Sequence, residues 1–255
     1  MTIVFSPYHN FSHSLAFIEA FKRLEANRRV APSAIGIPTH HSSIIFKLRS
    51  AKQHLDVILS MKEWVVPTLA NATSSGTIAT GSALTSIPSM QVSPTAYDIS
   101  GNLDDFFGNI ASAFDYFAQI VNLLYFSRPF PQRNVTFNKF MRMMRNKRPT
   151  ESINANLLST ARQQWYVDLK QFRHRATHQN IIDCQVFTSQ SLTQTSPYSL
   201  TKILLPDNPF NHMPTYRKNR DTRFVENIFR NALGALDQMF EIMESKIRTV
   251  NQVPV

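Results

Sequence analysis

The stretch LDDFFGNIASAFDYFAQIVNLLYF, residues 103–126, is the most apolar of the helix-like segments and decides the fold. Its large apolar residues recur every three or four positions and therefore share one helix face: Phe106, Ile110, Phe114, Phe117, Val121 and Leu124. Asp104 and Asp105 fall in the expected first turn, where acidic side chains complement the helix dipole, and Pro129 lies beyond the expected end. We therefore expect a long core helix here.

Four further segments have the apolar spacing of helices. They cover residues 11–29, 42–64, 150–180 and 222–248. Pro32 and Pro67 follow the first two, and proline disfavours helix because it has no amide hydrogen to donate. Long helices with one apolar stripe each pack well as an up-and-down bundle. The predicted fold class is therefore all-α, a bundle of four long helices with an extra N-terminal helix.

Three regions between these helices lack that spacing. Residues 68–100 are rich in Ser, Thr, Ala and Gly, and we expect them to form a mobile insertion. Residues 128–149 form a basic connector. Residues 181–210 contain two runs, IIDCQVF and YSLTKILL, separated by polar turn residues, which predicts a small β-hairpin insertion. The length of 255 residues favours a single domain, residues 1–255.

Composition and charge indicate which kinds of protein and partner to expect. A single cysteine, Cys184, excludes an internal disulfide and is expected to be a buried, inert thiol in a cytoplasmic protein. No run of eighteen apolar residues occurs, so no membrane span is expected. The chain has 27 Lys and Arg against 17 Asp and Glu, a net charge of +10. Such an excess favours a polyanionic partner, with nucleic acid as the first choice.

The basic connector supplies most of the expected nucleic-acid contacts. These are Arg142, Arg145, Lys147 and Arg148, with Arg175 added from the fourth long helix. Phe137 and Phe140 lie between the cations, so two interpretations stay open. The rings stack on bases while the cations bind phosphates, or they only anchor a basic loop to the bundle.

The densest polar cluster is QFRHRATHQN, residues 171–180, late in the fourth helix. A solvated basic face is the simplest interpretation. A metal site is a second, because His174 and His178 are four residues apart, a spacing that zinc helices use. Zinc needs at least three protein ligands, and the nearest acid, Asp183, lies beyond the expected helix end. We therefore expect no metal.

A third interpretation rests on a resemblance. Arg173-His174-x3-His178 resembles the Arg-[Asn/Asp/His]-x3-His signature of the HEPN superfamily (higher eukaryotes and prokaryotes nucleotide-binding domains). The resemblance covers the four long helices and implies a helical bundle that acts as a metal-independent ribonuclease, without cofactor, through a homodimer. It leaves room for a neutralising partner protein. A second Arg-x4-His pair, Arg49 and His54, lacks the polar residue after Arg and is taken as coincidence.

The chemistry of RNA cleavage suits these residue types. His178 is the expected general base for the 2′-hydroxyl because imidazole titrates near neutrality. Arg173 is expected to bind the developing phosphorane charge, and His174 to orient Arg173 or bind phosphate. Arg173 and His178 are five residues apart, about 140° around a helix, so one chain cannot bring both to one phosphate unless the helix distorts. Two chains at a dimer cleft would solve that geometry.

The sequence thus predicts a metal-independent endoribonuclease that acts on RNA. The alternative is a non-catalytic helical module that binds nucleic acid or a protein partner through the same charged face. Two other positions carry expectations. Asp115 lies opposite the apolar stripe and is expected to be an exposed acid, with the dimer cleft as the alternative. His40 and His41, at a helix start, are expected at the surface.

Overall fold

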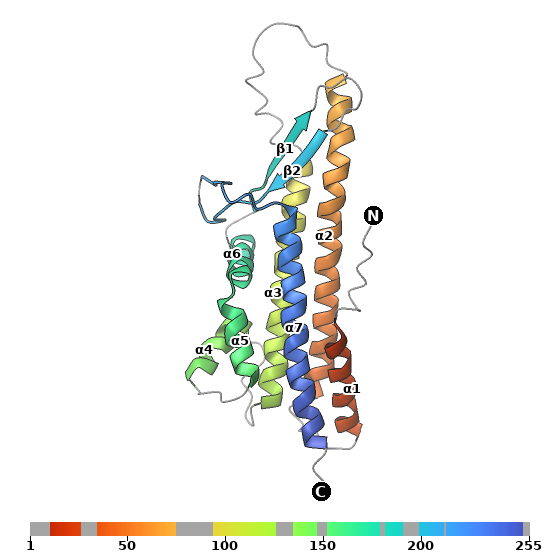
Figure 1. Ribbon diagram of the computed structural model, residues 1–255, viewed down its shortest axis with the longest axis vertical. Helices are drawn as coiled ribbons and strands as arrows, with labels where there is room; N and C mark the ends of the chain where they lie inside the picture. The colour runs from red at the N-terminus through yellow and green to blue at the C-terminus, as the bar shows by residue number, and fades with distance from the viewer. Residues whose placement is uncertain are drawn as a thin grey trace. The chain divides into compact units, whose positions relative to one another are not determined.

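The chain folds into helices with one small hairpin (Figure 1). The computed structural model describes residues 11–26, 35–74, 94–125, 135–146, 152–178, 182–190, 199–211 and 213–251. Its elements are α1 (Ser12–Ala26), α2 (Ile37–Ser74), α3 (Pro94–Tyr125), α4 (Phe137–Asn146), α5 (Ser152–Arg162), α6 (Gln164–His178), β1 (Gln185–Gln190), β2 (Ser199–Leu204) and α7 (Thr222–Asn251). The predicted all-α bundle with a hairpin insertion is confirmed. No described helix combines the length and the apolar character needed to cross a bilayer.

The hairpin lies inside the predicted insertion of residues 181–210. Strands β1 and β2 pair antiparallel, with Gln185 opposite Leu204 and Gln190 opposite Ser199. Ile203, Leu204 and Leu205 are buried on the inner part of β2 and just after it. The apolar run that predicted β2 therefore also supplies its buried side chains.

Two helix boundaries differ from those expected, and both shorten the predicted insertion of residues 68–100. Helix α2 continues through Pro67 to Ser74, so this proline lies inside the helix. Helix α3 begins at Pro94, in the first helical position, where the missing amide hydrogen costs nothing. Asp104 therefore lies in the interior of α3 and not in its first turn. Residues 75–93 are outside the described residues.

The predicted fourth long helix is two helices, separated at Gln163 (Figure 1). The amide of Gln163 donates to the Thr160 carbonyl at 3.1 Å, three residues back, which closes α5 with a tight turn. The carbonyl of Gln163 then accepts hydrogen bonds from Tyr166 and Val167, each at 3.1 Å, and so begins α6. The Gln163 side chain also accepts the indole N–H of Trp165.

The basic connector contains a helix, α4. Thr136 begins it, because its carbonyl accepts the Phe140 amide at 2.8 Å and its hydroxyl accepts the Lys139 amide at 3.3 Å. The Asp115 carboxylate on α3 accepts the Phe137 amide at 2.8 Å. Asp115 is half-buried and binds the start of α4, so the expected exposed acid has a structural role.

The contacts divide the chain into two compact units. Unit 1 comprises residues 1–50, 109–169 and 228–255, and unit 2 comprises residues 51–108 and 170–227. Helices α2, α3, α6 and α7 contribute residues to both units.

Unit 1 is centred on the ring of Phe240 on α7. The ring centroids of Phe11, Phe17 and Phe117 lie 5.6, 5.2 and 5.1 Å from it. The His41 ring on α2 lies 5.7 Å away. One fully buried side chain therefore contacts aromatic rings from α1, α2, α3 and the residue preceding α1.

The adjacent histidines of α2 are buried and not, as expected, at the surface: His40 is 9% and His41 6% exposed. The Nε2 atom of His41 lies 2.7 Å from the Ser14 hydroxyl and 3.1 Å from the Ser14 carbonyl oxygen. Burial lowers the pKa of His41 more than the hydrogen bond to Ser14 raises it, and nearby Lys22 lowers it further. His41 is thus a neutral core histidine that joins α2 to α1.

We predict that Phe240→Ala lowers the free energy of unfolding by about 3–5 kcal/mol, because it leaves a cavity that four surrounding rings cannot fill. Urea unfolding followed by circular dichroism measures this loss. Phe46→Ala is the matched control, since Phe46 on α2 is 64% exposed, and a change within about 0.5 kcal/mol is expected there. Equal losses in the two variants would show that the Phe240 cluster does not stabilise unit 1.

Candidate functional site

The Arg-His-x3-His motif occupies the last two turns of α6, in unit 2. The Thr177 hydroxyl donates to the Arg173 carbonyl at 2.9 Å, four residues back, so both residues lie on continuous helix. The Arg173 side chain is half-buried, and the His174 side chain is exposed. The His174 ring lies 5.5 Å from the ring of Phe210, which follows β2. His178 is the last residue of α6, and its side chain is outside the described residues.

Arg175 turns toward acidic neighbours of unit 2. Its guanidinium lies 3.9 Å from the Asp183 carboxylate, and its side chain is only 15% exposed. It also interacts electrostatically with Asp104 on α3. The sequence-based assignment of Arg175 to nucleic-acid binding stays a prediction, and two acids of unit 2, Asp183 and Asp104, lie near its guanidinium.

Asp104 is the ionisable group that sequence reasoning missed. Its carboxylate accepts the Ile182 amide at 3.3 Å, and this amide belongs to the segment that follows α6. Burial raises the pKa of Asp104 to about 6, with a further rise from Asp105, while the Ile182 amide and Arg175 lower it. A carboxyl group with that pKa exchanges protons near neutrality, as general acids and bases do.

A signal for Asp104 was present in the sequence. Two adjacent acids, Asp104 and Asp105, directly precede Phe106 and Phe107, whose side chains are fully buried. The pattern does not separate the two acids: the Asp105 side chain is 68% exposed, whereas Asp104 is half-buried and accepts the Ile182 amide. The tertiary contact with Ile182 was the missing observation.

Two further groups of unit 2 have raised pKa values. Burial raises the pKa of the Cys184 thiol more than its contact with the Ser100 hydroxyl, at 3.3 Å, lowers it. Burial and the proximity of Asp183 and Cys184 raise the pKa of Tyr216 to about 12. Both groups are therefore protonated at neutral pH, and a protonated thiol is a poor nucleophile.

The basic residues of the connector have different placements. Arg142 is exposed on α4, in unit 1, beside exposed Lys139. The side chain of Arg145 and all of Lys147 and Arg148 are outside the described residues. The two rings between these cations are 1% exposed at Phe137 and fully buried at Phe140. They pack in the core, so the interpretation in which they stack on bases is wrong.

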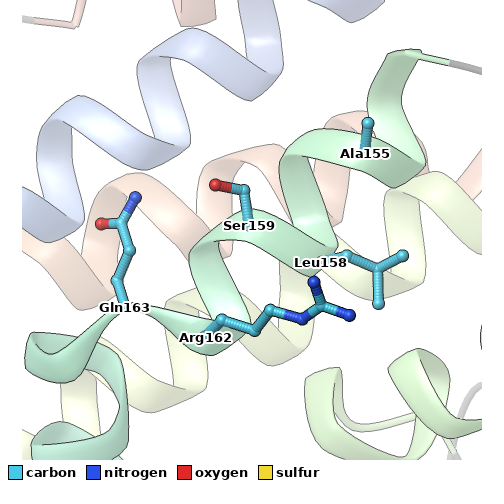
Figure 2. Close-up of a pocket in the computed structure, with 5 residues that line it drawn as sticks. All are labelled: Ala155, Leu158, Ser159, Arg162 and Gln163. Carbon is cyan, nitrogen blue, oxygen red and sulfur yellow. The ribbon is translucent and has the colours of Figure 1, made fainter.

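An open hollow of about 530 Å³ lies along the outer face of α5 in unit 1. Its lining residues are Ala155, Leu158, Ser159, Arg162 and Gln163. In Figure 2 the Arg162 side chain extends beside Leu158, and Gln163 stands at the junction with α6. Arg162 is the only charged residue of this lining. The hollow can hold an anionic or polar group, but it presents no acid or base.

Among the described side chains, no three His, Cys, Asp or Glu residues come close enough together to hold a metal ion. The side chain of His178 is not part of that set. Comparison of the chain with protein-family models, curated proteins and solved structures gives no match.

We predict that ionisation of Asp104 destabilises the fold. Its pKa is 3.8 in a free chain and about 6 here, so the folded state binds the proton more tightly. The stabilising contribution is complete below about pH 3.8 and is lost as the pH rises through 6. Asp104→Asn should therefore gain stability relative to wild type between pH 4.5 and about pH 7.5.

Urea unfolding at these two pH values measures the change. The control is Asp98→Asn, an exposed acid on the same helix, for which a much smaller pH-dependent difference is expected. Parallel pH profiles for wild type and Asp104→Asn would contradict the prediction.

Proposed function

We propose that this protein is a metal-independent endoribonuclease, on the resemblance of its motif to the signature of the HEPN superfamily. The observation that carries the proposal is the position of the motif. Arg173, His174 and His178 lie together in the last two turns of a bundle helix, where His174 is exposed. RNA is the substrate, a second copy of the chain completes the site, and a neutralising protein is the expected regulator.

The proposed roles follow from the chemistry of the side chains. His178 takes the proton of the 2′-hydroxyl because imidazole changes charge near neutral pH. Arg173 binds the phosphate as its charge develops in the transition state, because guanidinium stays charged and offers two parallel donors. His174 binds a neighbouring phosphate oxygen or orients Arg173.

The charge distribution of α4 and α5 supports RNA as the ligand. These helices contact each other in unit 1. Their sequences, FNKFMRMMRN and SINANLLSTAR, contain Lys and Arg but no acid. Lys139, Arg142 and Arg162 are exposed. A surface of this kind binds a phosphate backbone without sequence preference and releases counterions as it does so.

We predict that wild-type protein cleaves RNA in EDTA, and that Arg173→Ala and His178→Ala each lower the cleavage rate about 10²- to 10⁴-fold. Lys170→Ala is the matched control, because Lys170 is an exposed cation on the same helix outside the motif. It should retain cleavage. Activity that survives in both motif variants would exclude this site, and RNA binding without any cleavage would favour the non-catalytic module.

The second prediction concerns assembly. Arg173 and His178 are five residues apart, about 140° around a regular helix, so in the proposed site the base and the cation for one phosphate come from different chains. Mixing Arg173→Ala chains with His178→Ala chains should therefore restore part of the activity that each variant lacks alone. Analytical ultracentrifugation should show a dimer. A fully active monomer would exclude a site composed of two chains, but it would not exclude catalysis by the motif.

A further inference from the structure

The segment after β2 is a loop that is held by its own hydrogen bonds and lies beside the motif. We define the Asp207 loop as residues 207–211 and 213–219. The Leu205 amide donates to the Arg220 carbonyl at 2.8 Å, and the Asp207 amide donates to the Thr215 carbonyl at 2.7 Å. Asn219 has a φ of 49°, a left-handed conformation that asparagine tolerates better than most residues. Local hydrogen bonds therefore define the path of the loop.

The Asp207 carboxylate organises the far end of this loop. It accepts the Lys218 amide at 2.7 Å, the Arg217 amide at 2.8 Å and the Thr215 hydroxyl at 2.9 Å. Desolvation raises the pKa of Asp207, but these donors together outweigh it and hold the pKa below its usual value. Asp207 is therefore ionised at neutral pH, and its charge is directed at backbone donors.

This anchoring fixes the backbone of two adjacent cationic residues, Arg217 and Lys218. The backbone amides of Arg217 and Lys218 point at Asp207, while both side chains are exposed. A fixed backbone lowers the entropy that a ligand must remove when it binds. Arg217 and Lys218 are thus two adjacent positive charges on a preorganised backbone.

Two contacts fix the loop against α6. The Phe210 ring lies 5.5 Å from the ring of His174. The guanidinium of Arg220, where the loop ends, lies 5.7 Å from the ring of Phe172 on α6 and donates to the Asp207 carbonyl at 3.0 Å. The loop therefore touches residues on both sides of Arg173 in the sequence.

We infer that the Asp207 loop is a phosphate-binding arm of the RNA site, in which Arg217 and Lys218 bind the backbone of the strand that enters the α6 motif. The inference rests on the proposed function for the identity of the ligand. It adds residues that the motif does not contain. A single RNA strand suits the arm because successive phosphates offer one anion to each of two adjacent cations.

The first test is RNA binding by the double variant Arg217→Ala/Lys218→Ala, measured by fluorescence anisotropy with a labelled single-stranded RNA in EDTA. Affinity should fall roughly tenfold or more. The slope of log affinity against log salt should become shallower by about 1.4, which is about 0.7 for each lost contact. The matched control is Lys22→Ala/Arg23→Ala, an adjacent exposed pair on α1, and it should bind as wild type does.

The variant Asp207→Ala distinguishes the effect of the fixed loop backbone on RNA affinity from the effect of net charge. It removes a negative charge, so simple electrostatics predicts tighter RNA binding. If the loop must be held in place, the same variant binds more weakly, because Arg217 and Lys218 lose their fixed backbone. Weaker binding, with an unchanged circular dichroism spectrum, is the expected result. Tighter binding would overturn the role of Asp207.

Different results would contradict the phosphate-binding role of the Asp207 loop and the proposed endoribonuclease activity. Equal RNA affinities for the Arg217→Ala/Lys218→Ala variant and its α1 control would overturn the arm, whether or not the protein cleaves RNA. Wild type can bind RNA without cleaving it while the Arg217→Ala/Lys218→Ala variant binds RNA poorly. That result would exclude the endoribonuclease but support the phosphate-binding role of the Asp207 loop. Equal loss of affinity for RNA and for poly-glutamate would also overturn it, as the arm would then bind any polyanion.

Discussion

The geometry of the candidate site depends on one buried cation, the guanidinium of Arg220. It is centred 4.8 Å from the ring of Phe224 and 5.7 Å from the ring of Phe172, and only 7% of the residue is exposed. Burying a charge is costly unless it finds compensating partners. Here the two ring faces and the Asp207 carbonyl offer such partners. This one residue therefore ties the end of α6, the Asp207 loop and the start of α7 together.

The position of the motif at a helix C-terminus has an electrostatic consequence. Exposed carbonyls give the C-terminal end of α6 a partial negative charge, which repels a phosphate and attracts cations. Arg173, Arg175 and His178 are favourable there even in a protein that binds nothing. Some positive charge at this end only offsets the partial negative charge of the helix. Binding of an RNA phosphate there requires positive charge beyond that amount. Asp183 offsets part of the Arg175 charge at 3.9 Å, so in the proposed site Arg173, the Asp207 loop and a second chain are the further sources of positive charge.

Unit 2 also contains three half-buried ionisable groups. Asp104, Cys184 and Tyr216 all have pKa values raised mainly by burial. Of the three, only Asp104 has a pKa near neutrality. Its hydrogen bond to the Ile182 amide places this proton-exchanging group next to the segment that leaves α6. A change in its charge acts on the backbone that follows the motif.

The sequence by itself determined helices α1, α2, α3 and α7, the hairpin and the position of the motif, because each depends on residues a few positions apart, but it did not predict α4. Apolar spacing identified the core face of α3, and runs rich in β-branched and apolar residues identified β1 and β2. Only the tertiary structure decided the break at Gln163, the passage of α2 through Pro67 and the burial of Phe140, His40 and His41. It also decided the pKa of Asp104. Those properties depend on partners distant in the chain, such as Asp115 for α4, Ser14 for His41 and Ile182 for Asp104. Local periodicity carries no information about which distant groups desolvate a side chain or satisfy its hydrogen bonds.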